Sequence, residues 1–494
     1  MSRDAVDRGR QAIVLVPEIS LTPQTVARFR ARFERVAVLH SHLTDAERRG
    51  YWEEIRDGNA QVVIGARSAV FAPTPALGLI VIDEEHETSF KQNSTPRYHA
   101  REVAVERGRL QRVPVVLGTA TPALETYLRA DRGEYGLLRM PNRIDDLPMP
   151  PVEIVDRTSE PRTHGPPGLI GRRLRNAMTQ VLEQKDQILL FLNRRGHSTF
   201  LCCTRCGHVV RCERCEITLT YHRARRRASC HYCGFEIPPP TRCPACKGTS
   251  LRYLGAGTER IEEEVRDRFP NARVARMDSD TTRARGSVDE TLGRFRDGQI
   301  DILVGTQMIA KGLDFPDVTL VGIVSPDITL NLPDFRASER TFQLVTQVAG
   351  RAGRSRKGGL VIVQTYNPDH ACIRRAARHD YEGFAQDELP MRRELRYPPY
   401  ARLMRILLQG KDEQRVARIA GDVRAALMDA MRPADLLGPT PAPLAYLDGK
   451  HRFHLLAKAE THEGFEPHAK AVREAMKGVR DVTLTLDVDP TETL

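Results

Sequence analysis

Residues 79–86 read Leu-Ile-Val-Ile-Asp-Glu-Glu-His, an apolar run that ends in three acidic side chains and a histidine. A short, bounded apolar run predicts a buried strand of a parallel sheet. Open α/β sheets bind ligands at the carboxyl ends of their strands, which is where Asp83 and Glu84 would lie. Asp83 would hold Mg²⁺, and Glu84 would polarise a water for phosphoryl transfer. An isolated acidic tetrad is more often a solvated loop, so the rest of the chain decides between the two interpretations.

The first part of the chain alternates between short apolar runs and amphipathic helical patterns. We expect buried strands at residues 12–16, 61–64, 77–82 and 114–117. We expect helices at residues 23–33 and 45–57. Strands that alternate with helices predict βαβ units, in which helices cover a parallel sheet. The pattern therefore predicts an α/β lobe over residues 1–146, followed by a proline-rich linker over residues 147–168.

A second alternating segment covers residues 169–370 and predicts another lobe with a parallel sheet. Its expected strands are residues 188–192, 301–304, 318–324 and 360–364. A cysteine-rich block over residues 201–254 is inserted in this lobe. Residues 371–494 then predict a smaller α+β domain. The elements expected there are a strand near 401–408, a helix at 413–431 and a strand at 482–488.

The cysteine-rich block contains four Cys-x-x-Cys pairs, a spacing that lets two thiolates reach one tetrahedral metal ion. The eight cysteines are Cys203, Cys206, Cys212, Cys215, Cys230, Cys233, Cys243 and Cys246. Four pairs supply two four-sulfur sites, although the spacing does not say which pairs combine. An iron–sulfur cluster is the alternative, but four equal pairs suit two separate, closed, structural zinc sites better. Cys202 and Cys372 are left over.

The composition favours a cytoplasmic protein with a polyanionic partner. Cysteines clustered in one block fit a reduced cytoplasm better than a disulfide framework. The sequence shows no signal-peptide pattern and no run of 18 consecutive apolar residues, so we expect no membrane span. The formal net charge is +11. Two zinc ions on eight thiolates would leave about +7, a mildly basic balance that favours nucleic acid weakly.

Three further segments support the nucleotide interpretation of the acidic tetrad. Residues 347–354 read Gln-Val-Ala-Gly-Arg-Ala-Gly-Arg and would place Arg351 and Arg354 on one face of a helix. Such a pair can stabilise the charge that develops on a γ-phosphate. Residues 118–122 and 305–316 form loops after two other expected strands. Four such segments, ordered on two lobes, predict a nucleic-acid motor.

Together with residues 16–24, 65–71 and 191–196, these segments are similar to the motifs of superfamily 2 helicases of the DExH type. With eight cysteines directly after the last of them, the chain resembles the primosomal replication-restart helicases, the PriA family. The resemblance implies two RecA-like lobes, a double-zinc insertion in the second lobe and a small C-terminal α+β domain. It implies an ATP-dependent 3′→5′ DNA helicase that acts at stalled forks. The implied partners are forked and single-stranded DNA, primosome proteins and the single-strand DNA-binding protein.

The resemblance also assigns roles to individual residues. Asp83 and Glu84 match the family's Mg²⁺ and hydrolysis acids, and His86 would couple the nucleotide state to DNA. Arg351 and Arg354 match the family's arginine motif. Two further positions expected to bind nucleotide are Gly305 and Gln347. Residues 89–101 match an aromatic-rich loop that senses DNA, and the side chains expected to contact DNA there are Phe90, Lys91, Arg97, Tyr98 and Arg101.

The resemblance also implies how the cysteine pairs combine. The outer pairs, Cys203/Cys206 and Cys243/Cys246, would hold one zinc ion. The inner pairs, Cys212/Cys215 and Cys230/Cys233, would hold the other.

The chain departs from the motor pattern in one respect. An ATP motor of this type needs a glycine-rich loop that ends in Gly-Lys-Ser/Thr, and the sequence contains none. We therefore expect a longer protein in which a phosphate loop and an N-terminal DNA-binding region precede Met1. The alternative is a scaffold for primosome assembly that binds fork DNA without hydrolysing ATP. A superfamily 2 enzyme that acts on RNA is disfavoured by the cysteine insertion.

Overall fold

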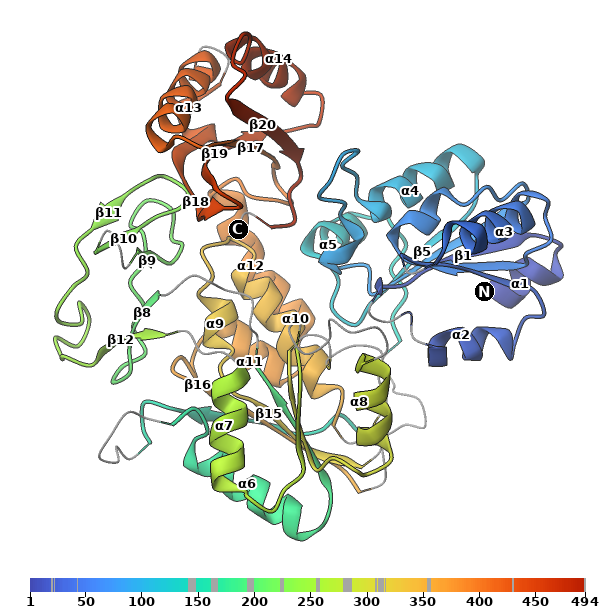
Figure 1. The fold of residues 1–494 in the computed structure, drawn as a ribbon, viewed down its shortest axis with the longest axis horizontal. Coiled ribbons are helices and arrows are strands. Elements are labelled where there is room, and N and C mark those ends of the chain that lie inside the picture. The colour runs from blue at the N-terminus through green and yellow to red at the C-terminus, as the bar shows by residue number, and fades with distance from the viewer. Residues whose placement is uncertain are drawn as a thin grey trace. The chain divides into compact units, whose positions relative to one another are not determined.

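The computed structural model describes residues 1–18, 21, 23–41, 43–140, 148–160, 168–192, 200–222, 226–254, 258–278, 287–306, 309, 315, 317–352, 357–428 and 431–492. The chain divides into two compact units, one from Met1 to Tyr135 and one formed by most of the chain from Gly136 onward, and each is described by itself. Figure 1 shows the elements of both. None of the helices in the described ranges combines the length and the apolar character that crossing a membrane requires.

The first unit is built on a five-stranded parallel sheet with strand order β2-β3-β1-β4-β5. Its strands are β1 Gln11–Leu15, β2 Val36–Leu39, β3 Val62–Gly65, β4 Leu77–Asp83 and β5 Val115–Gly118. Its helices are α1 Ser2–Asp7, α2 Pro23–Arg30, α3 Asp45–Arg56, α4 Ala100–Gln111 and α5 Leu124–Asp131, with 3₁₀ helices η2 Arg67–Phe71 and η3 Thr88–Phe90. Every residue of β1 and β3 is buried, which explains the unbroken apolar runs at residues 12–15 and 62–64. The predicted parallel sheet is confirmed, and β2 is the strand that the sequence pattern missed.

The second unit contains a six-stranded parallel sheet with strand order β13-β14-β7-β15-β16-β6. Its strands are β6 Val152–Asp156, β7 Gln187–Phe191, β13 Val274–Met277, β14 Ile302–Gly305, β15 Val318–Ile323 and β16 Leu360–Thr365. The helices around this sheet are α6 Arg172–Glu183, α7 Thr258–Arg268, α8 Ser287–Arg296, α9 Asp327–Leu330 and α10 Ala337–Ala349. The second predicted parallel lobe is therefore confirmed.

Part of the predicted linker over residues 147–168 is wrong. β6 pairs in parallel with β16, from Val152 opposite Val361 to Asp156 opposite Thr365, and forms an edge of the sheet. Its sequence, Val-Glu-Ile-Val-Asp, has the β-branched residues of a strand. The prolines on both sides hid this signal.

Two helices precede the C-terminal sheet and belong with α10 rather than with that sheet. α11 Ala371–Ala377 and α12 Tyr381–Glu394 pack on α10. The ring of Phe342 on α10 stacks on the ring of Phe384 on α12, with centroids 4.5 Å apart. The sequence predicts that the C-terminal domain starts at residue 371. The sheet of this domain starts about thirty residues later, at β17 Arg402–Gly410.

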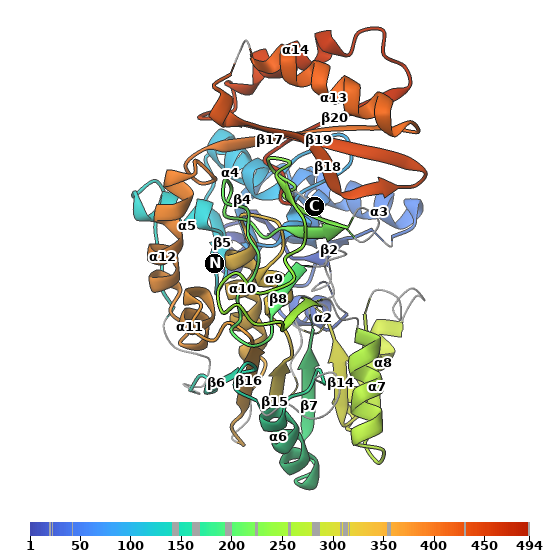
Figure 2. The ribbon, with the colours of Figure 1, turned by 90° about the vertical axis from the view of Figure 1, so that its left-hand side faces the viewer.

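The C-terminal sheet is antiparallel with strand order β18-β19-β17-β20. The remaining strands are β18 Leu436–Leu447, β19 Lys450–Ala459 and β20 Val482–Val488. The helices α13 Glu413–Met428 and α14 Phe465–Ala475 cover one face, as Figure 2 shows. β18 was not predicted because its run holds several prolines. An edge strand tolerates them, since an edge leaves backbone groups unpaired in any case.

The cysteine-rich block forms a small antiparallel sheet of its own with strand order β11-β10-β9-β8-β12. Its strands are β8 Phe200–Cys203, β9 Thr220–His222, β10 Arg227–Ser229, β11 Glu236–Ile237 and β12 Leu251–Leu254. We refer to this part of the second unit as the insertion.

Candidate metal centre and nucleotide-binding residues

The eight expected ligands come together as two separate groups of four cysteines. The outer site is Cys203, Cys206, Cys243 and Cys246, and the inner site is Cys212, Cys215, Cys230 and Cys233. Within each group, all four sulfur atoms lie within 4.8 Å of one another. The sulfurs of Cys203 and Cys246 are 3.7 Å apart. Four zinc–sulfur bonds of about 2.3 Å in a tetrahedron place the sulfurs about 3.8 Å apart, so each group fits one zinc ion.

Each Cys-x-x-Cys pair occupies the same kind of tight turn. The backbone N–H of the residue after the second cysteine donates to the carbonyl oxygen of the first, at 2.8–3.0 Å in all four turns. This residue has a positive φ in every turn, and the four residues are Gly207, Glu216, Gly234 and Lys247. At Gly207 space also demands glycine, because a Cβ would collide with the carbonyl oxygen of Tyr366. The repeated turn explains why two residues between cysteines suffice to aim both sulfurs at one point.

Neither of the two remaining cysteines joins a zinc site. The sulfur of Cys202 lies 3.8 Å from the carbonyl oxygen of Gly207, and burial raises the pKa of its thiol. Cys372, in α11, is also buried, and burial raises its pKa in the same way. Both sulfurs lie outside the two groups of four cysteines, so neither residue completes a metal site.

Replacing Cys212 and Cys215 together by serine should release one zinc ion and leave the other bound. The two sites share no ligand, so the four sulfurs of the outer site stay in place when the inner ion is lost. The matched variant, Cys203→Ser with Cys206→Ser, should likewise keep one ion. Elemental analysis by mass spectrometry counts the zinc ions in each protein. Loss of both ions, or of neither, would show that the sites are not independent.

In the first unit, β4 delivers the acidic tetrad to the carboxyl edge of the sheet. Asp83 is the last residue of β4, and the residue keeps part of its surface in contact with solvent. Glu84 follows with a φ of 50°, a conformation that costs energy for a residue other than glycine and that concentrates at functional sites. The N–H of Glu84 donates to Oδ1 of Asp83 at 3.1 Å. The surrounding protein removes part of the hydration of Asp83 and raises its pKa, so a bound cation would stabilise the ionised form.

His86 lies between the acidic residues and the loop that follows the neighbouring strand, β5. Its Nδ1 lies 2.8 Å from Oγ1 of Thr119 and 3.7 Å from Oε2 of Glu84. Thr119 is within reach because Asp83 lies opposite Gly118 where β4 pairs with β5. His86 therefore lies between the second acid and the loop over residues 118–122.

Glu85 is a structural centre of the first unit to which the sequence assigned no role. Its side chain is fully buried and accepts a hydrogen bond from Nη1 of Arg101 at 2.8 Å. It also accepts from the N–H of Ala123 at 2.7 Å and from Oγ1 of Thr126 at 2.9 Å. Glu85 thus ties the end of β4 to the first turn of α4 and to the start of α5. Its place inside the tetrad was the only signal in the sequence.

The loop over residues 89–101 differs from the predicted DNA-contacting surface. Phe90, Lys91 and Arg101 are only 1%, 4% and 9% exposed, so in this conformation they cannot stack on bases or meet phosphates. Phe90 lies in the apolar core and Arg101 is held by Glu85. The two other expected residues, Arg97 and Tyr98, are half-buried. The side chain of Arg67 fixes this loop, since its Nη1 donates to the carbonyl oxygens of residues 89 and 91.

In the second unit, the expected nucleotide-binding residues lie at the ends of β14 and α10. Gly305 ends β14, and a Cβ there would lie 2.8 Å from the carbonyl oxygen of Met277, so close strand packing explains this glycine. Gln347 lies in the last turn of α10, and the helix ends at Ala349. The expectation that a helix carries Arg351 is therefore wrong, because this residue lies in the turn beyond it. Arg354 is outside the described residues.

The fold is the body of a superfamily 2 helicase. It has two parallel α/β lobes, with the acidic tetrad at the carboxyl edge of the sheet in the first lobe, and a four-stranded domain at the end of the chain. Family models match the chain piece by piece. They are the DEAD/DEAH box helicase over residues 2–130, the helicase conserved C-terminal domain over 251–356, the PriA DNA helicase Cys-rich region over 212–238 and the primosomal protein N C-terminal domain over 393–491. The chain belongs to the replication restart protein PriA family.

Relatives match almost the whole of this chain. The replication restart protein PriA of Bacillus subtilis (strain 168) is 46% identical over 489 residues, which cover 98% of this chain and 60% of that protein. The protein of the same name from Synechocystis sp. is 42% identical, and the match covers 99% of this chain and 60% of that protein. The replication restart protein PriA of Treponema pallidum (strain Nichols) is also 42% identical, and the match covers 99% of this chain and 73% of that protein. The chain thus spans 60% of the length of the first two relatives.

Proposed function

We propose that this chain is the motor and zinc-binding part of a replication-restart DNA helicase. The protein would hydrolyse ATP, unwind DNA 3′→5′ at stalled forks and help to assemble the primosome. The observation that carries the proposal is the combination, in one chain, of the acidic tetrad on a helicase lobe with two four-cysteine sites. Membership of the PriA family supports it independently.

The site residues support an ATPase with roles divided between the two lobes. Asp83 would hold Mg²⁺, which neutralises the charge of the phosphates during phosphoryl transfer. Glu84 would orient the attacking water, and His86 would pass the nucleotide state to the loop that contains Thr119. Arg351 would supply positive charge at the γ-phosphate. The same role is proposed for Arg354, and contacts to nucleotide are proposed for Gly305 and Gln347.

ATP hydrolysis also needs a phosphate loop, and this chain contains no Gly-Lys-Ser/Thr sequence. We assign hydrolysis to a protein that combines such a loop with the present residues.

The proposed partners are forked and single-stranded DNA, primosome proteins and the single-strand DNA-binding protein. The positive charge of the chain, formally +11 and about +7 with both zinc sites filled, favours DNA because phosphate contacts dominate nucleic-acid affinity. In the loop over residues 89–101, Arg97 and Tyr98 are the best placed to meet DNA, since the other expected residues are buried.

A fork-binding scaffold without turnover is the second candidate, and the missing phosphate loop favours it. DNA-stimulated ATP hydrolysis separates the two functions. The helicase proposal predicts that fork DNA stimulates hydrolysis in the protein that carries a phosphate loop, and that the 494-residue chain alone shows none. A phosphate-loop protein that binds forks without hydrolysing ATP would support the scaffold.

A further inference from the structure

The turn that holds half of the inner site sends two buried side chains in different directions. Tyr232 and His231 lie between the ligands Cys230 and Cys233, and each is only 1% exposed. The hydroxyl oxygen of Tyr232 accepts a hydrogen bond from the backbone N–H of Phe335, just before α10, at 3.2 Å. A residue between two metal ligands has little freedom once the metal is bound. The position of Phe335 is therefore tied to the inner site.

Phe335 starts a stack that ends at the C-terminal sheet. Its ring lies parallel to the ring of Tyr397, with centroids 4.7 Å apart and planes 7° apart. Nζ of Lys458, on β19, lies 4.2 Å from the centroid of Tyr397. On Phe335, the guanidinium of Arg392 lies 4.9 Å from the ring centroid. Cation–π contacts of this kind strengthen when they are removed from water.

The stack is fixed to α10 by a buried ion-pair network. Arg392 is completely buried and donates to Oε2 of Glu339 at 2.9 Å and to Oε1 of Glu388 at 3.0 Å. Glu339 lies in the first turn of α10, the helix that leads to Arg351 at its other end. The inner site and the start of α10 are thus linked by an unbroken series of contacts through Phe335.

His231 makes the corresponding link to the C-terminal sheet. Its Nδ1 lies 3.0 Å from the carbonyl oxygen of Pro441 in β18. Its own carbonyl oxygen lies 2.7 Å from Nε2 of His454 in β19. The face of the sheet on which His454 lies carries polar residues and is nevertheless buried. Its buried polar members are Arg405, Arg452, His454 and Lys458.

The outer site has different neighbours. Its turn at Gly207 presses against the carbonyl oxygen of Tyr366, at the end of β16. The apolar cluster beside it joins residues of β8 to Tyr366 and Leu254. These contacts hold the insertion to the sheet of the second lobe, and they involve neither α10 nor β19.

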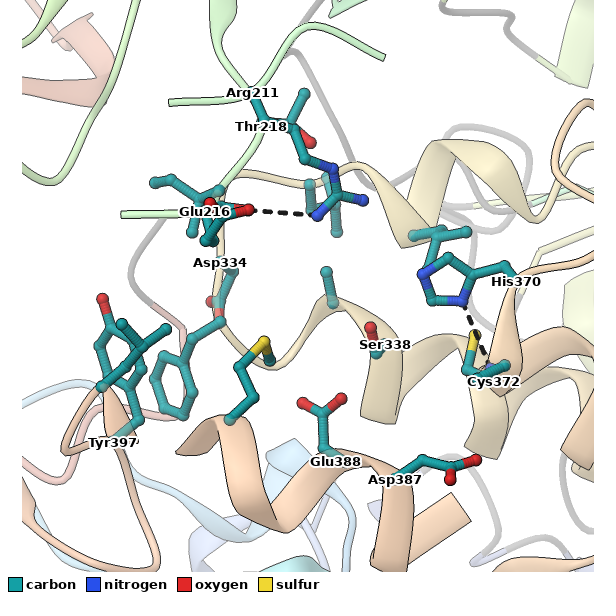
Figure 3. Close-up of a pocket in the computed structure, with 18 of the residues that line it drawn as sticks. Arg211, Glu216, Thr218, Asp334, Ser338, His370, Cys372, Asp387, Glu388 and Tyr397 are labelled. Atoms are coloured by element: carbon teal, nitrogen blue, oxygen red, sulfur yellow. Dashed lines mark hydrogen bonds between the residues drawn. The ribbon is translucent and has the colours of Figure 1, made fainter. Parts of the chain in front are cut away.

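A cavity limits the contact between the insertion and the helices. Its volume is about 210 Å³, and Cys215, Phe335 and Tyr397 are among the residues that line it. Figure 3 shows Arg211 and Glu216 of the insertion across this space from Asp387 and Glu388 of α12. Because the cavity leaves this part of the boundary between the insertion and the helices unpacked, a larger share of the contact between them falls on the stack of Phe335 and Tyr397.

We propose that the two zinc sites have separate positioning roles. The inner site holds α10 and the C-terminal sheet in alignment through Tyr232 and His231, whereas the outer site holds the insertion to β16. Loss of the inner ion would free both links at once. This inference does not depend on ATP hydrolysis.

Hydrogen exchange measured by mass spectrometry on the complete chain tests the proposal. In Cys212→Ser with Cys215→Ser, amides at the start of α10 and in β19 should exchange about tenfold faster than in the unaltered protein. In the matched pair, Cys203→Ser with Cys206→Ser, these amides should stay within about twofold, while peptides at residues 364–367 lose protection.

Two single substitutions separate the links without touching a ligand. Tyr232→Phe should keep both zinc ions and accelerate exchange at the start of α10 but not in β19. His454→Leu should keep both ions and accelerate exchange in β19 but not at the start of α10. Equal exchange in the two cysteine variants would overturn separate roles. If exchange at the start of α10 and in β19 stays unchanged in the inner-site variant and in the two single variants, the contacts of Tyr232 and His231 do not align these elements.

Discussion

Replacing Asp83 by asparagine is expected to lower DNA-stimulated ATP hydrolysis by about 100-fold or more in the protein that carries a phosphate loop. A bound metal ion contributes several kcal/mol to such a reaction, and about 3 kcal/mol corresponds to a factor of about 100. The neutral amide loses the charge that would hold Mg²⁺. It keeps the shape of the side chain and an oxygen that can accept from the N–H of Glu84. The effect should therefore fall on turnover and leave the fold intact.

The controls for this variant measure DNA binding and a matched substitution. Affinity for a fork, measured by fluorescence anisotropy, should stay within about twofold, because Asp83 is placed to bind the nucleotide rather than DNA. Asp131→Asn makes the same chemical change at an exposed position in the last turn of α5 and should leave hydrolysis unaltered. Normal turnover in Asp83→Asn would refute the assignment of the magnesium ligand.

Replacing Arg392 by methionine is expected to destabilise the second unit by about 3–5 kcal/mol. Methionine fills similar space but leaves Glu339 and Glu388 buried without the cation that they share. A buried charge that loses its partner costs far more than an exposed one, because water cannot replace the partner. Thermal unfolding followed by circular dichroism would report a large drop in the melting temperature of this unit.

Arg375 provides a close comparison, since it also pairs with two carboxylates, Asp380 and Asp387. This network is about one-third exposed, so Arg375→Met should lower stability far less than Arg392→Met does. Converting Glu339 and Glu388 to glutamine in the Arg392→Met background should recover part of the loss. Equal destabilisation by the two arginine substitutions would contradict the expectation that the buried ion pairs of Arg392 cost more to break than the exposed ones of Arg375.

The sequence predicted the architecture where one physical signal dominates. Buried parallel strands such as β1 and β7 are continuous apolar runs after an initial glutamine, and the parallel lobes followed from them. The four cysteine turns followed from spacing, because each turn is local. β6 and β18 could not be found in this way, since prolines obscured strands that are specified by pairing with distant partners.

The candidate site was predictable to a similar degree. The ends of β4 and β14 placed Asp83 and Gly305 correctly at strand termini, because the period and length of a strand are local properties. Burial in the loop over residues 89–101 is a tertiary property. Nothing in its composition distinguishes Arg101, held by Glu85, from an arginine that faces solvent. The contacts of Tyr232 are likewise invisible until the insertion is placed against α10.

The most direct test of the proposed function is ATP-dependent unwinding of tailed duplexes by the protein that includes a phosphate loop. Two substrates with the same duplex carry a single-stranded tail at either the 3′ or the 5′ end, and a fork carries both arms. The proposal predicts that the fork and the 3′-tailed duplex are unwound with ATP, and that Asp83→Asn abolishes this activity. Fork binding without ATP-dependent unwinding of either substrate would contradict the helicase and leave the scaffold.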